Sequence, residues 1–173
     1  MLGSYLVCDM GNGRKILGRI VETEAYDQTD AASHSYKGRT PRTDVMFGPA
    51  GRLYVYFTYG MHYCCNIVTG PVGTGSAVLL RAVEPLEGQD VMEQNRNGRS
   101  GVELTNGPAK LCQAFGIDKK WNGHDLAELP MRLIVNDAVP QDDIIQTTRI
   151  GISQGKDVPW RWYIKGNPYV SKP

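Results

Sequence analysis

The sequence predicts a single α+β domain with a curved, mainly antiparallel β-sheet and a few helices on one side. The length of 173 residues suits one compact domain. Short runs of β-branched and aromatic residues alternate with frequent Gly, Asn and Pro turn signals, which is typical of hairpins. A Rossmann or barrel fold is not indicated, because strands do not alternate with helices and no GxGxxG, GxxxxGK(S/T), GxSxG or HExxH motif is present.

The expected strands lie between these turns. One hairpin turns at Gly11-Asn12-Gly13 and a second turns at Tyr59-Gly60. A later strand is apolar except for Arg81. In chain order the expected strands are residues 5–7, 15–26, 53–59, 61–69, 76–83, 131–136 and 162–165.

Fewer helices are expected. Residues 108–115 have a helix start in Thr105-Asn106-Gly107-Pro108 and a stop at Gly116. Residues 86–94 form a second candidate helix, and residues 27–35 are expected to hold a short helical turn.

The composition bounds the class of protein. No apolar stretch is long enough to span a bilayer, so no membrane association is expected. The four cysteines lack zinc-ligand spacing, which favours free thiols in a reduced compartment, and the adjacent Cys64 and Cys65 should face opposite ways on a strand. We therefore expect an intracellular protein, in the nucleus if the source is eukaryotic and in the cytoplasm or nucleoid if it is bacterial.

The charges are unevenly distributed. The formal net charge of +1 is weak for a DNA-binding protein. However, residues 37–52 carry four basic and one acidic side chain, and residues 149–173 carry five and one, whereas residues 84–143 carry eleven acids and six bases. This pattern indicates either a basic face that binds a polyanion with marked salt dependence or loops that are merely solvated.

Two carboxylates are candidates for acid–base chemistry. Glu22 and Glu24 lie two residues apart near the end of the expected strand 15–26, so a regular strand places both on one face. One of them would be a general base, or the two an acid–base pair. The alternative is an exposed edge strand without chemistry, and the period of the strand does not choose between the two residues.

His34 is one of three histidines and follows the acidic strand closely. It would hydrogen-bond or stack on a base, or it would be an ordinary surface histidine. A metal site built from Glu24, His34 and Cys64 or His62 is a weaker alternative, because the spacing fits no known template.

Tyrosines alternate along the expected strand 53–59, so one face is aromatic and polar while the other is apolar. Tyr26, Tyr56 and His34 would together sandwich an extruded base, because every base offers a π-face. Tyr59, at the hairpin tip, is expected either to fold back over the core or to project as a wedge of the kind that DNA-bending proteins insert into the base stack.

Two basic residues suggest further contacts. Arg81 interrupts an apolar strand and needs a partner, for which Glu24 or a bound phosphate would serve, and a structural salt bridge is the alternative. The segment from Asn106 to Lys110 offers free backbone N–H groups at a helix start and a lysine, which would contact a phosphate or simply cap the helix.

Taken together, the sequence blocks resemble the alkyladenine (3-methyladenine) DNA glycosylase family. The resemblance spans nearly the whole chain with its blocks in order. The blocks are Gly18-Arg-Ile-Val-Glu-Thr-Glu-Ala-Tyr26, Ser33-His34-Ser35, Thr40-Pro41-Arg42, Met46-Phe47, Leu53-Tyr-Val-Tyr56, Tyr59-Gly-Met61, Asn66-Ile67, Leu79-Leu-Arg-Ala-Val-Glu-Pro85, Asn106-Gly-Pro-Ala-Lys-Leu-Cys112, Arg149-Ile-Gly-Ile152 and Gly166-Asn-Pro-Tyr-Val-Ser171.

The resemblance implies a role for each candidate residue. Glu24 matches the general base, with Glu22 as its structural partner, and Arg81 matches the arginine that helps to hold the attacking water. The family's backbone carbonyl contact to that water falls at Ile150. The remaining matches are Tyr26, His34 and Tyr56 as base-stacking walls, Tyr59 as the intercalating residue, and Asn66 as the side chain that crowds the guanine amino group. Arg42 and Lys110 are expected to contact the DNA backbone.

The resemblance also implies a fold and an activity. The fold is one mixed domain, similar to the C-terminal domain of formyltransferases, with a curved sheet and a protruding β-hairpin. Family members flip 3-methyladenine, 7-methylguanine, hypoxanthine and ethenoadenine out of double-stranded DNA and hydrolyse the N-glycosidic bond. We expect neither a metal nor a cofactor, and we expect no cleavage of the DNA strand. The protein is expected to be a monomer. The family usually carries a helical segment before its first strand, and residues 1–173 form the catalytic domain without it.

Two other classes of function remain open from the sequence. One is a catalytically silent module that recognises distorted DNA, and binding without base release would favour it. The other is a metal-dependent hydrolase that uses Glu24, His34 and Cys64, and loss of activity in a chelator would favour that reading.

Overall fold

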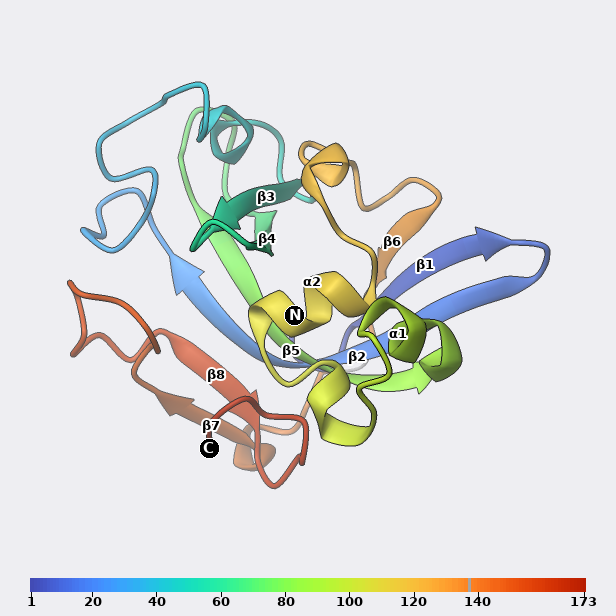
Figure 1. Cartoon of the computed structure of the whole chain (residues 1–173). Coiled ribbons are helices and arrows are strands. Elements are labelled where there is room, and N and C mark those ends of the chain that lie inside the picture. Colours follow the sequence, from blue (N-terminus) through green and yellow to red (C-terminus); the bar gives the residue numbers. More distant parts are fainter. Residues whose placement is uncertain (137) are drawn as a thin grey trace.

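The computed structural model describes residues 1–136 and 138–173, and it is organised around one antiparallel sheet. The strands follow the order β3-β4-β5-β2-β1-β6, with β8 paired to β2 and β7 paired to β8 (Figure 1). The strands are β1 (Tyr5–Gly11), β2 (Arg14–Tyr26), β3 (Leu53–Thr58), β4 (His62–Val68), β5 (Ala77–Glu87), β6 (Met131–Ile134), β7 (Ile144–Thr147) and β8 (Arg161–Ile164).

Strand β2 is the spine of this sheet. From Leu17 to Tyr26 it pairs with β5, while its other edge pairs first with β1 and then, at Glu22 to Glu24, with β8. Gly18 in its middle allows close packing, because a Cβ there would lie 3.0 Å from both the Phe115 and the Val83 side chains. The same strand therefore contributes to the core at one end and to the candidate site at the other.

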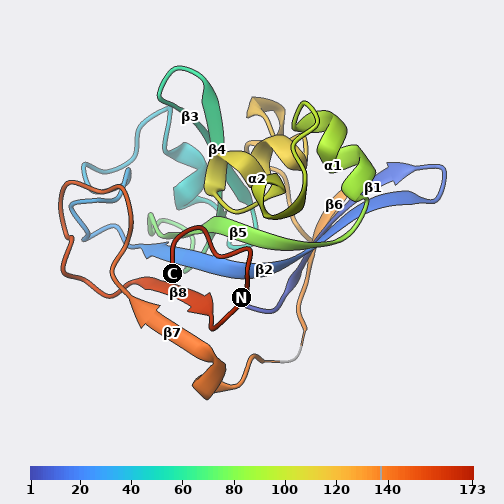
Figure 2. The same cartoon turned by 60° about the horizontal axis from the view of Figure 1, so that its bottom comes forward.

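Helices α1 (Gln89–Asn95) and α2 (Pro108–Ala114) cover one face of the sheet (Figure 2). Their apolar side chains pack with those of β1 to β6 into the main hydrophobic core, which includes fully buried Leu80, Met92 and Leu111. Short 3-10 turns complete the fold at η1 (Asp44–Phe47), η2 (Gly101–Leu104), η3 (Lys119–Trp121) and η4 (Gln141–Asp143).

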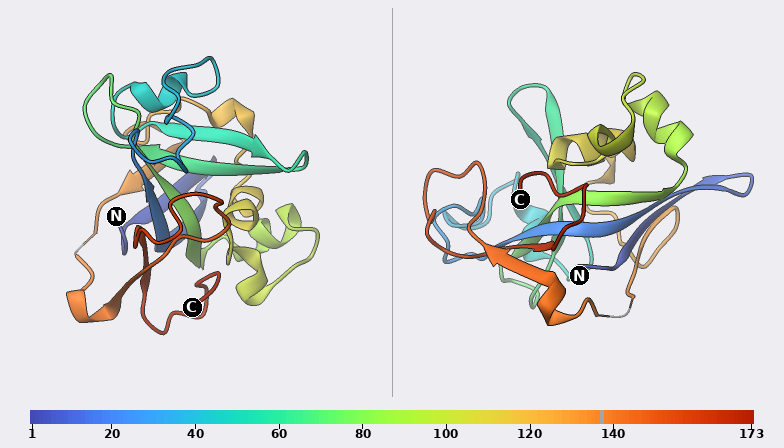
Figure 3. Two further views of the ribbon diagram at one scale, coloured as in Figure 1. Left: turned by 90° about the vertical axis from the view of Figure 1, so that its left-hand side faces the viewer. Right: turned by 90° about the horizontal axis from the view of Figure 1, so that it is seen from below.

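The β3–β4 hairpin projects from the body of the protein (Figure 3). Tyr59 and Gly60 form its turn with positive φ angles of 51° and 68°, as a tight hairpin turn of the primed type requires. On β3, Leu53 and Val55 point into the main core, whereas Tyr54 and Tyr56 lie on the opposite face. The predicted alternation along this strand is confirmed.

The predicted α+β class, both hairpins and the helix at 108–115 are confirmed. Two expectations are wrong. The second helix begins at Gln89 rather than at residue 86, because β5 continues to Glu87 to pair with Leu17. Residues 27–35 form consecutive turns in place of a helical turn, since Asp27 and Asp30 bind backbone N–H groups two residues ahead. Strand β7 was not predicted.

Within the described residues, no helix is long and apolar enough to cross a membrane. All four cysteines are free and buried. Cys65 lies in the main core while Cys64 lines the pocket described below, so the two side chains face opposite sides of β4, as predicted.

Candidate active site

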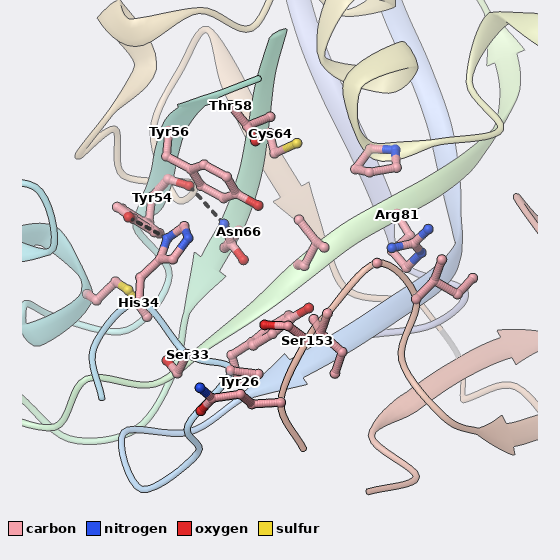
Figure 4. A pocket seen from close by; sticks show the side chains of 18 of the residues that line it. Tyr26, Ser33, His34, Tyr54, Tyr56, Thr58, Cys64, Asn66, Arg81 and Ser153 are labelled. Carbon is pink, nitrogen blue, oxygen red and sulfur yellow. Dashed lines mark hydrogen bonds between the residues drawn. The ribbon is translucent and has the colours of Figure 1, made fainter. Parts of the chain in front are cut away.

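A pocket of about 460 Å³ opens where β2, the β3–β4 hairpin, β5 and two loops meet (Figure 4). The two loops are residues 31–34 and 150–154. Figure 4 shows several predicted side chains gathered around this space, although they come from four separate parts of the chain. Those that line it are Tyr26, His34, Tyr56, Tyr59, Asn66 and Arg81.

Glu24 lies just beneath the pocket surface and has no exposed area. Three groups that themselves line the pocket hold its carboxylate. Arg81 Nη1 forms an ion pair with Oε1 at 3.1 Å, the Ile150 backbone N–H donates to Oε1 at 2.7 Å, and the Tyr26 hydroxyl donates to Oε2 at 2.8 Å. The carboxylate is thus fixed in orientation and kept out of bulk solvent.

Glu22 is equally buried but has different partners. Its Oε1 accepts from Arg161 at 2.7 Å and from Arg81 at 3.1 Å, and its Oε2 accepts from the Ser171 N–H at 2.7 Å. The prediction that Glu22 and Glu24 share a face is confirmed, because both contact Arg81. Through these bonds Glu22 joins β8 and residue 171 to β2, so its interactions stabilise the fold.

A β-bulge places Arg81 between the two glutamates. In the β2–β5 register Glu22 pairs with Ala82 and Thr23 with Leu80, so Arg81 has no partner opposite. A bulge of this kind re-aims a side chain. The guanidinium therefore bridges Glu22 and Glu24, while its edge lines the pocket. The two carboxylates are the partners that a charged residue inside an apolar strand was expected to need.

One wall of the pocket is aromatic. The rings of His34 and Tyr56 meet edge to face at 4.5 Å, and the Tyr54 hydroxyl lies 2.9 Å from His34 Nδ1. Partial burial, with a smaller contribution from the Arg42 cation, lowers the pKa of His34 to about 4. The imidazole is therefore neutral at physiological pH and offers one donor and one acceptor.

Several other side chains that line the pocket are neutral. Asn66 donates to the Tyr54 carbonyl at 3.3 Å, and Leu79 and Cys64 lie on neighbouring positions of β5 and β4. Burial, with a contribution from Cys65, raises the pKa of the Cys64 thiol to about 11, so it stays protonated. Burial also raises the pKa of Tyr26, with Glu24 adding to the shift.

The three predicted DNA contacts differ in their relation to the pocket. Tyr59 is 83% exposed at the hairpin tip, so it projects and does not fold over the core. Arg42 is exposed, and its guanidinium lies 5.6 Å from the centre of the Tyr56 ring. Lys110 lies outside the pocket lining, and Glu103 and Asn106 hold its amino group at 2.8 Å each.

Two of the basic residues counted near the C-terminus are not surface charges. Arg149 and Arg161 are 5% and 4% exposed, and their partners are Asp30 and Glu22. The two readings left open for this segment, a basic face and solvated loops, both fail for these two residues, because each arginine neutralises a buried carboxylate. The sequence did not predict the Arg149–Asp30 pair, although Arg149 begins one of the quoted blocks and Asp30 lies three residues before another.

A metal centre would need several ligating side chains close together. In the part of the chain that the structure describes, no three His, Cys, Asp or Glu side chains gather in this way. The set Glu24, His34 and Cys64 or His62, considered from the sequence, is not brought together, and His62 lies outside the pocket.

An aromatic pocket backed by a buried, arginine-bound carboxylate is the kind of site that holds a flat ring beside a hydrolytic base. Comparison with known proteins agrees with this class. The model of the methylpurine-DNA glycosylase (MPG) family matches residues 1–168, and the chain belongs to that family.

Similar proteins carry a matching name, "Putative 3-methyladenine DNA glycosylase". One from Carboxydothermus hydrogenoformans is 54% identical over 99% of this chain and 90% of its own length. One from Francisella tularensis is 49% identical over the same shares, and one from Methanoculleus marisnigri is 49% identical over 90% and 82%. The chain is therefore a hydrolytic DNA glycosylase of DNA repair, and DNA is its substrate.

Proposed function

We propose that this glycosylase, as a monomer, flips alkylated and deaminated purines out of double-stranded DNA and leaves an abasic site in an unbroken strand. The lesions are 3-methyladenine, 7-methylguanine, hypoxanthine and ethenoadenine. The observation that carries the proposal is one pocket, lined by Tyr26, His34 and Tyr56, with Glu24 directly behind it.

In this proposal Glu24 is the general base. It takes a proton from a water molecule as the water oxygen attacks C1′ of the deoxyribose, and the C1′–N9 bonding electrons leave with the purine. Its carboxylate also stabilises the oxocarbenium-like sugar. Arg81 helps to hold the water near the sugar from the adjacent edge of the pocket. The backbone carbonyl of Ile150 makes a further contact with this water. Because Glu24 has no exposed surface, a small movement of Tyr26 or of the loop at Ile150 admits the water.

The walls select a flat base. Tyr26, His34 and Tyr56 stack on the flipped purine, and Asn66 crowds the amino group that guanine carries and hypoxanthine lacks. Tyr59, exposed at the hairpin tip, fills the gap left in the duplex. Arg42 and Lys110 contact the DNA backbone, Lys110 after exchanging its hold on Glu103 for a phosphate.

The leaving group sets the demand for acid assistance. Alkylation at N3 or N7 makes the purine cationic, so it leaves readily, whereas neutral hypoxanthine needs protonation at N7. The rate of hypoxanthine release should therefore rise and then fall with pH, and that of 7-methylguanine should only rise. No lysine is among the described residues that line the pocket, which supports hydrolysis by water without a Schiff base or strand cleavage.

The test is single-turnover release of hypoxanthine from a duplex oligonucleotide with EDTA present. Glu24→Gln is compared with the parent and with Glu87→Gln, a control in a half-exposed salt bridge to Lys15. We expect release by the parent and the control and none by Glu24→Gln. Binding without release by the parent would favour a silent DNA-binding module, and activity that returns only without chelator would favour the metal-dependent alternative.

A further inference from the structure

The buried ion pair of Arg149 and Asp30 joins the two loops that border the pocket. Both side chains are buried. Arg149 Nη1 and Nη2 both donate to the Asp30 carboxylate, the second at 3.1 Å. Neither residue lines the pocket itself.

Each partner stands at the end of a pocket-lining segment. Asp30 directly precedes the lining segment 31–34, and its Oδ1 also accepts the Ala32 N–H at 3.0 Å. Arg149 directly precedes the lining segment 150–154, and its Nη2 donates at 3.3 Å to the carbonyl of Gly155, which follows that segment. One guanidinium therefore closes the second loop at both ends and ties it to the start of the first.

The same guanidinium also contacts the residue beside the candidate base. Arg149 lies 4.7 Å from the centre of the Tyr26 ring, and its Nη1 donates to the Ala25 carbonyl at 2.9 Å. Tyr26 and Ile150, the residue after Arg149, supply the two hydrogen bonds to the Glu24 carboxylate. Arg149 thus contacts one of these donors and directly precedes the other in the chain.

Gly155 is shaped to fit this pair. Its φ is +59°, and a Cβ on it would lie 2.9 Å from Arg149 Nη2 and 3.0 Å from Asp30 Oδ1. A side chain at this position would therefore push the ion pair apart as well as strain the backbone. This offers a way to disturb the pair without changing either charge.

We propose that the Arg149–Asp30 pair is a positioning element, which sets the separation of the two pocket loops and aims the Tyr26 hydroxyl and the Ile150 N–H at Glu24. The inference rests on the proposed role of Glu24 as general base. Lysine cannot replace Arg149, because a single ammonium group cannot bind the Asp30 carboxylate, two carbonyls and an aromatic face together.

The experiment measures hypoxanthine release under single-turnover conditions, with enzyme raised until the rate constant stops increasing. This saturating rate constant does not depend on how much of the enzyme is folded, whereas the concentration needed to reach it does. The variants are Arg149→Lys, Asp30→Asn, their double variant and Gly155→Ala. Arg52→Lys is the matched control, because Arg52 also joins a carboxylate, Asp125, to a carbonyl, at Gly123, outside the pocket lining.

We expect Arg149→Lys to lower the saturating rate constant by about tenfold to hundredfold, since misplacing catalytic groups by about 1 Å has effects of that size. Gly155→Ala should lower it too, the double variant should be no worse than the poorer single variant, and Arg52→Lys should stay within about twofold. If Arg149→Lys and Gly155→Ala reached the parent's rate constant, only at higher enzyme concentration, the positioning role would be overturned and the proposed function would stand. If the parent released no base, or Glu24→Gln did release it, both the proposed function and the positioning role would be overturned.

Discussion

Replacing Glu22 by Gln tests the buried network that supports Arg81. Glu22 Oε1 accepts from two guanidinium groups and from the Ser171 hydroxyl, and Oε2 accepts the Ser171 N–H. A glutamine that keeps its oxygen toward the arginines must turn its NH₂ toward the Ser171 N–H, so that two donors meet. The substitution also removes one of the two carboxylates that neutralise Arg81 and Arg161.

The magnitude follows from burial. Breaking a buried ion pair at one partner costs about 3–5 kcal/mol, because the remaining charge is left uncompensated. In a protein of this size that corresponds to a fall in Tm of roughly 6–20 °C. Asp90→Asn makes the same chemical change in the exposed Arg14–Asp90 pair, where the effect should stay within about 1 kcal/mol.

Urea unfolding of the two variants and the parent gives the free energies of unfolding directly. The midpoint for Glu22→Gln should fall with an unchanged slope, as expected for a change in stability alone. The saturating rate of base release should also fall, because Arg81 loses one of its two anchors. If Glu22→Gln and Asp90→Asn lost the same small amount of stability, Glu22 would not hold the network together.

Three other predictions concern the pocket and its rim. Tyr59→Ala should weaken binding to lesion-containing duplex without changing Tm, because the side chain is 83% exposed; gel-shift affinity and thermal melting check this, and a lowered Tm with unchanged affinity would contradict it. Asn66→Ala should raise the rate of guanine-lesion removal relative to hypoxanthine, and an unchanged ratio in a competition assay would count against its gating role. The free energy of unfolding should decrease as pH falls from about 6.5 to 4. The reason is that His34 binds a proton in the unfolded chain over this range, whereas its pKa in the folded protein is about 4. The parent's Tm should therefore fall more steeply than that of His34→Gln between pH 6.5 and 4.5, and parallel curves would refute the shift.

Local signals in the sequence predicted the elements whose partners lie nearby. The Gly11-Asn12-Gly13 and Tyr59-Gly60 turns set the two hairpins, and Pro108 with Gly116 bounded α2. The start of α1 was wrong because pairing with β2 extends β5 beyond its apolar stretch. Strand β7 was not predicted, because its four residues form a strand only through pairing with β8.

The candidate site divided in the same way. A period of two residues was enough to put Glu22 and Glu24 on one side of β2, but it did not choose between them. What distinguishes the two carboxylates is their partners 126 to 149 residues away, Ile150 for Glu24 and Ser171 for Glu22. The Arg149–Asp30 pair was missed for the same reason, since 119 residues separate two side chains that each read as surface charges.

These long separations give the chain an order of assembly. When residues 1–136 have left the ribosome, every strand from β1 to β6 and both helices are present, so the main core and the hairpin can form. The carboxylate of Glu24 still lacks Ile150, and that of Glu22 still lacks Arg161 and Ser171. A nascent or prematurely terminated chain would thus expose Tyr59 at the hairpin tip before Glu22 and Glu24 had all their partners. Synthesis through residue 171 is the step that completes both buried carboxylate networks of this glycosylase.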